Sequence, residues 1–231
     1  MSTPYILGFI AITLGYLCGS IPVGLWIGKL VLNVDIRNYG SGTTGATNVI
    51  RTCGLKWGII VFFIDIFKSI IPTFLTVVAS NNGIVPIWTP PIIGMSIMFG
   101  HNWPVFANFH GGKGVAVGLA TLFVMSPFSG ILAFSIALII MLSTKYVSVG
   151  SMIGSLVGGI GLFLQITMED FPIEIIQTRD FSYAIFAIGG TVLTLYKHKD
   201  NIERLLKGEE MKLGDPAKII NTKEIHDRSE E

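Results

Sequence analysis

The sequence predicts an all-α integral membrane protein with seven transmembrane helices. Of its 231 residues, 51% are hydrophobic and only 13% are charged, and the mean hydropathy is +0.66. Such values are typical of a chain whose surface mostly faces lipid. Long apolar segments alternate with short polar stretches, and lysine and arginine occur in some of those stretches but not in others. The first pattern predicts the helices and the second their orientation.

The first apolar segment, 5–32, is too long for one straight crossing of a hydrocarbon core about 30 Å thick. The run Gly19-Ser20-Ile21-Pro22 predicts a kink within it. A cleaved signal peptide is not expected, because the segment lacks a basic n-region and exceeds the length of a signal core. Four more spans are expected at 55–79, 84–100, 147–167 and 181–196.

The positions of the charged residues predict which side each loop faces. The loop at 168–180 holds four acidic residues against one arginine, and the positive-inside rule places it outside. The same rule places the basic stretches in the cytoplasm. These are the loops at 35–51 and 100–114, Lys145, and the tail from Lys197 onward.

The apolar tract at 115–143 is interrupted only by Ser126-Pro127 and has two interpretations, one long helix or a hairpin of two short helices. A single helix would put Lys145 outside and the acidic loop inside. A hairpin keeps every basic stretch cytoplasmic, so the sequence predicts seven spans with the N-terminus outside and the C-terminus in the cytoplasm. Each arm is short for a full crossing.

This topology predicts two regions. Residues 1–196 form a seven-helix transmembrane domain, with polar motif loops at 35–51 and 100–114. Residues 197–231 form a cytoplasmic tail whose start completes the site. Because all the polar stretches face one side, we expect them to converge on one site at the cytoplasmic membrane surface.

The loop at 35–51 reads D-I-R-N-Y-G-S-G-T-T-G-A-T-N-V-I-R and predicts a phosphate site. Its glycines allow backbone N–H groups to turn toward an anion, and its hydroxyl, amide and guanidinium groups add donors. The alternative is a flexible, solvated loop between two helices. The residues concerned are Gly40, Gly42 and Gly45, then Ser41, Thr43, Thr44, Thr47 and Asn48, with Arg37 and Arg51.

The loop at 100–114 predicts a second anion site. It contains His110-Gly111-Gly112-Lys113-Gly114, in which a lysine stands among glycines. This is not a Walker A motif and no acidic metal ligand follows it, so a nucleotide triphosphatase is excluded. A basic loop at the membrane interface is the alternative interpretation.

The tail and the loops supply candidate catalytic groups. Ile202, Leu205 and Leu206 recur at helical spacing and predict an amphipathic interfacial helix. This helix places His198 and Asn201 on one face.

Two further pairs need an interpretation. Asp65 and Lys68 lie three residues apart within the second span, and we expect a buried ion pair that braces the helices near the site rather than one that takes part in chemistry. Cys18 and Cys53 suggest neither a disulfide nor a metal site.

Taken together, these stretches resemble the PlsY family of membrane glycerol-3-phosphate acyltransferases, which use acyl-phosphate as donor. The resemblance runs in the family's order as far as about Gly214. The matching residues are Gly19-Ser20-Ile21-Pro22, Asp35-Ile36-Arg37, Gly40-Ser41-Gly42, Gly45-Ala46-Thr47-Asn48-Val49, Arg51, Gly100-His101, Pro104, Phe106, Gly111-Gly112-Lys113-Gly114-Val115-Ala116, Tyr146-Val147-Ser148, His198, Asn201-Ile202, Arg204-Leu205, Gly208 and Glu210.

There are departures from the family pattern. The chain has Thr43 where the family usually has Asn, His110 where it has Lys, and Lys199 where it has Arg. The tail after Gly214 is also longer than we expect. These differences leave the exact substrate contacts open.

The resemblance implies transfer of a fatty acyl group from acyl-phosphate to the 1-hydroxyl of sn-glycerol 3-phosphate, giving lysophosphatidic acid and phosphate. It also implies a monomer in the inner membrane of a bacterium, with its active site facing the cytoplasm, acting within phospholipid biosynthesis. Membrane lipids would surround it, and neither a cofactor, a metal nor nucleic acid is expected.

We assign roles on the same basis. The expected catalytic residues are His101, His198, Asn201, Ser41 and Arg51. The expected phosphate-binding residues are Gly40, Ser41, Gly42, Gly45, Thr47, Asn48, Arg51, Gly111, Gly112, Lys113 and Gly114, and the expected supporting residues are Ser20, Arg37, Ser148, Glu210, Asp65 and Lys68.

The alternative function is a membrane carrier or binding protein for a phosphorylated solute. Carriers tend to show internal repeats and charged groups near the middle of the membrane. This sequence shows no repeat and concentrates its polar groups on one side, which favours the enzyme.

Overall fold

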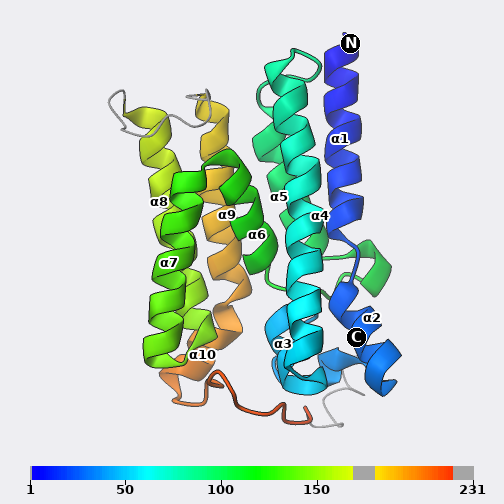
Figure 1. Ribbon diagram of the computed structural model, residues 1–231, viewed down its shortest axis with the longest axis vertical. Helices are drawn as coiled ribbons and strands as arrows, with labels where there is room; N and C mark the ends of the chain where they lie inside the picture. The colour runs from blue at the N-terminus through cyan, green and yellow to red at the C-terminus, as the bar shows by residue number, and fades with distance from the viewer. Residues whose placement is uncertain (1, 169–179, 221–231) are drawn as a thin grey trace.

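The computed structural model describes residues 2–168 and 180–220, which form an elongated bundle of helices (Figure 1). The predicted all-α class is confirmed, and across these residues the only extended pairing is an isolated antiparallel bridge between Tyr39 and Ile219. The helices are α1 (Thr3–Gly19), α2 (Val23–Leu32), α3 (Ala46–Cys53), α4 (Leu55–Asn81), α5 (Thr89–Asn102), α6 (Val115–Met125), α7 (Pro127–Thr144), α8 (Val147–Thr167), α9 (Ala184–Lys197) and α10 (Lys199–Leu206). Three short 3-10 turns are η1 (Ile36–Asn38), η2 (Val105–Ala107) and η3 (Phe181–Tyr183).

Within the described ranges, four helical stretches are long and apolar enough to cross a membrane. They are Thr3–Leu32, Leu55–Asn81, Pro127–Thr144 and Val147–Thr167. Large apolar side chains such as Phe63, Phe67 and Phe74 of α4 point outward and stay exposed, as lipid-facing residues do. The remaining helices of the bundle are shorter, so seven spans remain a prediction.

The predicted kink in the first apolar segment is confirmed. Helix α1 ends at Gly19 and α2 begins at Val23, after Pro22. Gly19 packs so closely on α5 that a Cβ there would overlap the backbone carbonyl of Ile97. The break therefore occurs where α1 is pressed against its neighbour, and it turns α2 toward the loops that follow.

The predicted turn at Ser126 is present, and it separates α6 from α7 as a helical hairpin (Figure 1). The Ser126 Oγ accepts a hydrogen bond from the Ser129 N–H at 3.2 Å and so caps α7, with Pro127 at its first position. Ser126 Oγ also donates to Gln165 in the last turns of α8. The turn thus lies beside the C-terminal end of α8.

The first loop, with α2 and α3, lies at the same end of the bundle as α10 and the tail, whereas the turn between α4 and α5 lies at the other end (Figure 1). The N-terminus lies at the opposite end from α2, α3, α10 and the tail. The end with the first loop has its own small apolar core of Val23, Ile36, Val49 and Val61, which joins this loop to α2 and α4. Which side of the membrane this end faces remains a prediction, and most of the acidic loop used for it lies outside the described residues.

Candidate active site

The first loop is shaped by Asn48, which is buried. Its Oδ1 accepts the N–H of Ser41 at 2.9 Å, and its Nδ2 donates to the carbonyls of Ile36 at 2.9 Å and Thr43 at 2.8 Å. With these bonds the amide group holds both ends of the turn. Its role is therefore to order the loop around Ser41.

The N–H groups of Gly40 and Gly42 are used within the protein. Both glycines have positive φ, +59° and +69°, as the sequence predicted from their type. The Gly40 N–H donates to the Lys218 carbonyl at 2.9 Å, and the Gly42 N–H donates to the Tyr39 carbonyl at 3.1 Å. The nest predicted from these two glycines therefore has its donors occupied.

Free backbone donors are found at two helix starts instead. Helix α3 begins after Gly45 and α6 begins after Gly114, and no side chain caps either one. The first N–H groups of a helix point along its axis and carry the positive end of its dipole. Two such ends face the same space, because Gly45, Ala46, Gly114 and Val115 all line one cavity.

The second loop is folded against His101 on α5. The Gly112 N–H donates to the His101 carbonyl at 3.0 Å, and a Cβ on Gly112 would overlap the His101 imidazole. The two loops are joined by the Thr44 N–H, which donates to the Gly111 carbonyl at 3.4 Å. The glycines of the G-G-K-G sequence thus allow close packing on the histidine.

Arg37 also joins the two loops and makes no contact with the cavity. It pairs with Asp35 at 2.6 Å and donates to the Ala107 carbonyl at 2.9 Å. Burial works to raise the pKa of Asp35, but its hydrogen bonds with Arg37 hold it below the usual value. Arg37 is thus a brace, in keeping with its expected supporting role.

The tail enters the site through Glu210, which is almost fully buried. One carboxylate oxygen accepts from Ser148 Oγ at 2.7 Å and Asn201 Nδ2 at 2.6 Å, and the other pairs with Arg204 at 2.8 Å. Burial works to raise the pKa of Glu210, but these hydrogen bonds outweigh it and lower the pKa. Glu210 therefore orients Asn201, whose side-chain oxygen accepts a hydrogen bond from the Lys113 ammonium.

These elements enclose a cavity of about 230 Å³, which we call the polar cavity. Residues expected in the site and found in its lining are Ser41, Gly45, Thr47, Asn48, Arg51, Asp65, His101, Lys113, Gly114, Ser148, His198, Asn201 and Glu210. Residues expected in the site but outside the lining are Ser20, Arg37, Gly40, Gly42, Lys68, Gly111 and Gly112. One cavity thus receives groups from both loops and from the tail.

Two cations, Lys113 and Arg51, line the polar cavity together with two carboxylates, and each carboxylate already has a cationic partner, Lys68 for Asp65 and Arg204 for Glu210. Burial, helped by nearby Arg204, lowers the pKa of Lys113 to about 8. Burial and the charge of Lys113 lower the pKa of His198 to about 4, so His198 is neutral at physiological pH. Arg51 is held by the carbonyl of Met211 at 3.2 Å, and its Nε has no protein partner in the described chain. The cavity is therefore prepared for an anion.

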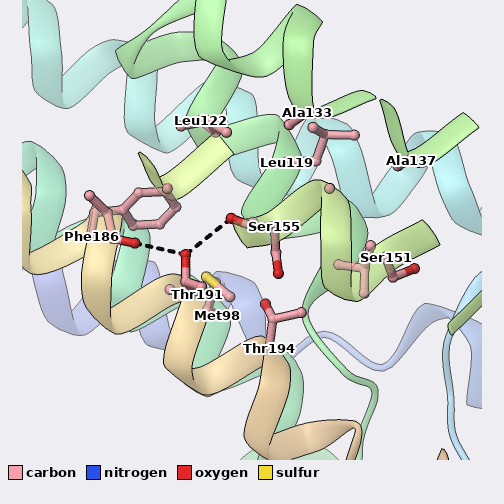
Figure 2. A pocket seen from close by; sticks show the side chains of 16 residues that line it. Met98, Leu119, Leu122, Ala133, Ala137, Ser151, Ser155, Phe186, Thr191 and Thr194 are labelled. Carbon is pink, nitrogen blue, oxygen red and sulfur yellow. Dashed lines mark hydrogen bonds between the residues drawn. The ribbon is translucent and has the colours of Figure 1, made fainter. Parts of the chain in front are cut away.

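A second pocket, of about 60 Å³, is mostly apolar (Figure 2). Val115 and Ser151 line both spaces, so the two meet at the start of α6. The apolar pocket lies between α5, α6, α7, α8 and α9, and its lining includes Met98, Leu119, Leu122, Ala133, Ala137 and Phe186. A polar head and an apolar tail of one ligand could thus occupy neighbouring spaces.

Sequence reasoning missed several lining residues. Phe62, Met141 and Ser151 face the polar cavity from α4, α7 and α8. Apolar residues in a span cannot be told from lipid-facing ones by composition. Ser151 gave a weak signal, because it lies three residues after Ser148 on a helix and shares its face.

Comparison with known proteins agrees with this geometry. The family model described as "Glycerol-3-phosphate acyltransferase" matches residues 9–208. Proteins with that name are 36% identical in Thermoanaerobacter sp. (strain X514), over 89% of this chain and 96% of the relative, and 38% identical in Aquifex aeolicus, over 84% and 93%. In Enterococcus faecalis the identity is 36%, over 94% of this chain and 98% of the relative.

Two solved structures also match. The crystal structure of PlsY (YgiH), an integral membrane glycerol 3-phosphate acyltransferase, in its glycerol 3-phosphate form has a TM-score of 0.77 and 36% identity, and covers 90% of this chain and 96% of its own. The lysophosphatidic acid form has a TM-score of 0.74 and 35% identity, with 90% and 95% covered. The sequence match, the shared fold and the resemblance seen in the motif loops agree, and the chain is a member of the glycerol-3-phosphate acyltransferase family.

Proposed function

We propose that the protein transfers a fatty acyl group from acyl-phosphate to the 1-hydroxyl of sn-glycerol 3-phosphate, in the cytoplasmic leaflet of a bacterial inner membrane. The products are lysophosphatidic acid and inorganic phosphate. The observation that carries the proposal is the polar cavity, where two uncapped helix starts, Arg51 and Lys113 meet beside an apolar pocket.

The cavity suits a reaction that brings two phosphate groups together. Each substrate carries one, and their mutual repulsion must be offset by positive groups. The start of α3 with Ser41 and Arg51 forms one positive wall, and the start of α6 with Lys113 forms the other. Helix starts and charged side chains both favour phosphate.

The reaction needs no covalent intermediate with the protein. The 1-hydroxyl oxygen attacks the acyl carbonyl carbon, and a new C–O ester bond forms as the bond from that carbon to the phosphate oxygen breaks. The leaving phosphate takes the bonding electron pair, and the hydroxyl proton passes to it. The donor is already activated, so the protein contributes mainly position and electrostatic stabilisation.

The polar side chains divide this work. Arg51 and Lys113 neutralise phosphate charge, and Asn201 keeps the Lys113 ammonium in place. His101 contacts the acceptor or the carbonyl oxygen as it gains negative charge, and His198 contacts the acceptor. We place the acyl chain in the apolar pocket, because that pocket shares Val115 and Ser151 with the lining of the polar cavity.

The test is phosphate release by purified protein supplied with palmitoyl-phosphate and glycerol 3-phosphate. Release should require both substrates, and acyl-CoA should be a poor donor. Lys113→Ala should lower kcat/KM by about tenfold to a hundredfold, since a charge-assisted hydrogen bond contributes about 1.5–3 kcal/mol.

Lys145→Ala is the matched control. The Lys145 side chain is exposed and does not line the polar cavity. Its backbone N–H donates to the Met141 carbonyl at 2.9 Å, and its carbonyl accepts the Leu213 N–H at 2.7 Å. Equal activity with acyl-CoA would refute the donor assignment. Binding of glycerol 3-phosphate without turnover would instead favour a carrier or binding protein.

A further inference from the structure

One wall of the polar cavity holds a buried cluster of Asp65, Lys68 and His101, of which the proposed reaction uses only His101. The Lys68 Nζ lies 2.7 Å from Asp65 Oδ1, 3.1 Å from the Ile21 carbonyl and 3.1 Å from His101 Nδ1. The side chains are only 6%, 3% and 7% exposed in the order Lys68, Asp65 and His101. Asp65 and His101 line the cavity, and Lys68 lies behind them.

The number of partners decides the direction of these bonds. A lysine ammonium has three N–H donors and no lone pair. The carboxylate of Asp65, 2.7 Å from Nζ, and the carbonyl of Ile21, at 3.1 Å, can only accept, so each takes one of these N–H groups. The third N–H therefore points at His101 Nδ1, which must accept it. A neutral imidazole that accepts at Nδ1 carries its proton on Nε2.

The position of Asp65 supports this direction. In a carboxylate–histidine pair the carboxylate accepts the Nδ1 proton and leaves Nε2 bare. Here Asp65 Oδ1 is 3.7 Å from His101 Nδ1, beyond hydrogen-bonding distance, and the ammonium of Lys68 contacts both. Because the direct partner of His101 Nδ1 is an ammonium and not a carboxylate, the proton of the imidazole is on Nε2 instead of Nδ1.

We propose that Asp65 and Lys68 are positioning residues that hold His101, which lines the polar cavity, as an Nε2–H donor. Its Nε2 lies beside Gly112, where only a glycine leaves room for it. No described residue accepts a hydrogen bond from this Nε2. The groups it suits are anionic or partly anionic oxygens, either of a phosphate or of the carbonyl under attack. The proposal rests on the proposed function only for the identity of that oxygen.

His198 is in the opposite tautomer. Its Nδ1 lies 2.7 Å from the Thr194 carbonyl, which only accepts, so the proton is on Nδ1 and Nε2 is bare. The two histidines that line one cavity thus differ in function. His101 donates to an oxygen, and His198 accepts from a hydroxyl or an N–H group.

Nitrogen-15 NMR of histidine-labelled protein in lipid nanodiscs, without substrate, tests the assignment directly. The chemical shifts of the two ring nitrogens distinguish the tautomers, and His101→Gln and His198→Gln identify the two signals. We expect the Nε2–H form at His101 and the Nδ1–H form at His198. Lys68→Met should convert His101 to a mixture of tautomers and leave His198 unchanged. The Nδ1–H form or a cationic ring at His101, or a Lys68→Met spectrum identical to that of the unaltered protein, would overturn the proposal.

Kinetics separate positioning from general bracing. Lys68→Met should lower kcat by about tenfold to a hundredfold through loss of orientation, with less effect on KM for glycerol 3-phosphate. The control is Ser69→Ala, at the residue that follows Lys68 on α4. It removes a buried hydroxyl that bonds to Val117 and Thr121 of α6 and to no histidine. It should lower the melting temperature and leave the His101 tautomer intact.

A loss of kcat in Lys68→Met matched by Ser69→Ala would show that the pair only braces the helices. Because the tautomer is read without substrate, the expected tautomers in a protein that lacks acyltransferase activity would refute the proposed function alone.

Discussion

Lys113 is the residue whose surroundings most directly link charge to function. Its ammonium is buried beside Asn201, and burial lowers its pKa to about 8. The group is therefore a cation at neutral pH but loses its proton within an accessible range. A lysine of ordinary pKa would stay charged up to about pH 10, and its titration would not change substrate binding between pH 7.5 and 9.5.

We expect KM for the phosphate-bearing substrates to rise as the pH passes above about 8. Only the cation binds an anion well, so binding is strong below the pKa of the free protein and weakens by roughly tenfold per pH unit above it. The second pKa of a phosphate monoester is about 6, so the substrates do not titrate in this range. The measurement is KM for glycerol 3-phosphate and palmitoyl-phosphate from pH 7.5 to 9.5.

Lys113→Arg is the matched variant, because an arginine stays charged throughout that range. Its KM values should be insensitive to pH, whatever their size. A flat profile in the unaltered protein would show that Lys113 is not the cation that holds a substrate.

Gly112→Ala should impair catalysis because its Cβ would overlap the His101 imidazole. From the sequence we expected this glycine to allow an anion to approach the backbone, and the structure gives a different reason. A displaced ring should lower kcat by up to about a hundredfold. Steady-state kinetics and the melting temperature of the variant provide the measurement.

Gly189→Ala provides the comparison, since a Cβ there meets only the flexible end of Met95 within a helix. It should keep full activity. Normal kcat in Gly112→Ala would mean that the second loop moves away from His101 at little cost.

At the scale of elements, the tail pairs with the first loop and adds to the hydrogen bonds by which Asn48 orders it. Residues 218–220 pair with residues 38–40, with the Gly40 N–H bonded to Lys218 at 2.9 Å and the Ile220 N–H bonded to Asn38 at 3.0 Å. The positive φ of the glycines in the first loop could be predicted from the sequence, because glycine adopts this conformation at little cost. The partners of their N–H groups could not be predicted, because a single isolated bridge produces no alternation of apolar and polar residues in the sequence.

A chain shortened to end at Gly214 should show faster amide exchange in residues 38–42. Each lost backbone hydrogen bond contributes about 1 kcal/mol, so exchange at Gly40 should rise about fivefold. Hydrogen exchange followed by mass spectrometry is the measurement. A chain that ends at Ile220 keeps both bonds and is the control, and equal exchange in the two shortened chains would contradict the pairing.

At the scale of the whole molecule, the hairpin is the feature on which the topology depends. Both the break at Ser126 and the positions of the basic residues could be read from the sequence, because proline and charge act locally. The convergence of α3 and α6 on one cavity could not, because it depends on the packing of α4 against both. The seven-span topology itself is still a prediction.

Cysteine labelling tests the orientation at the two ends of α8. Met168 and Lys145 are both exposed, and they flank this helix of 21 residues. An impermeant maleimide applied to intact cells should label Met168→Cys and not Lys145→Cys, and inverted membrane vesicles should give the reverse.

Ser126 itself is unsuitable for labelling because it is fully buried. The native thiols are replaced by serine, which preserves the bond from Cys18 to the Lys68 carbonyl. Labelling of Lys145→Cys in intact cells would contradict the predicted cytoplasmic position of Lys145.

The late position of Asn201 and Glu210 in the chain has a consequence for biosynthesis. A ribosome completes every long apolar helix before it adds the residues that orient Lys113. A frameshift or nonsense mutation just after Lys197 would therefore leave a chain that still inserts into the bilayer and occupies the insertion machinery. Such a chain would lack the polar groups of the tail, so a screen for membrane insertion alone would count a null allele as functional.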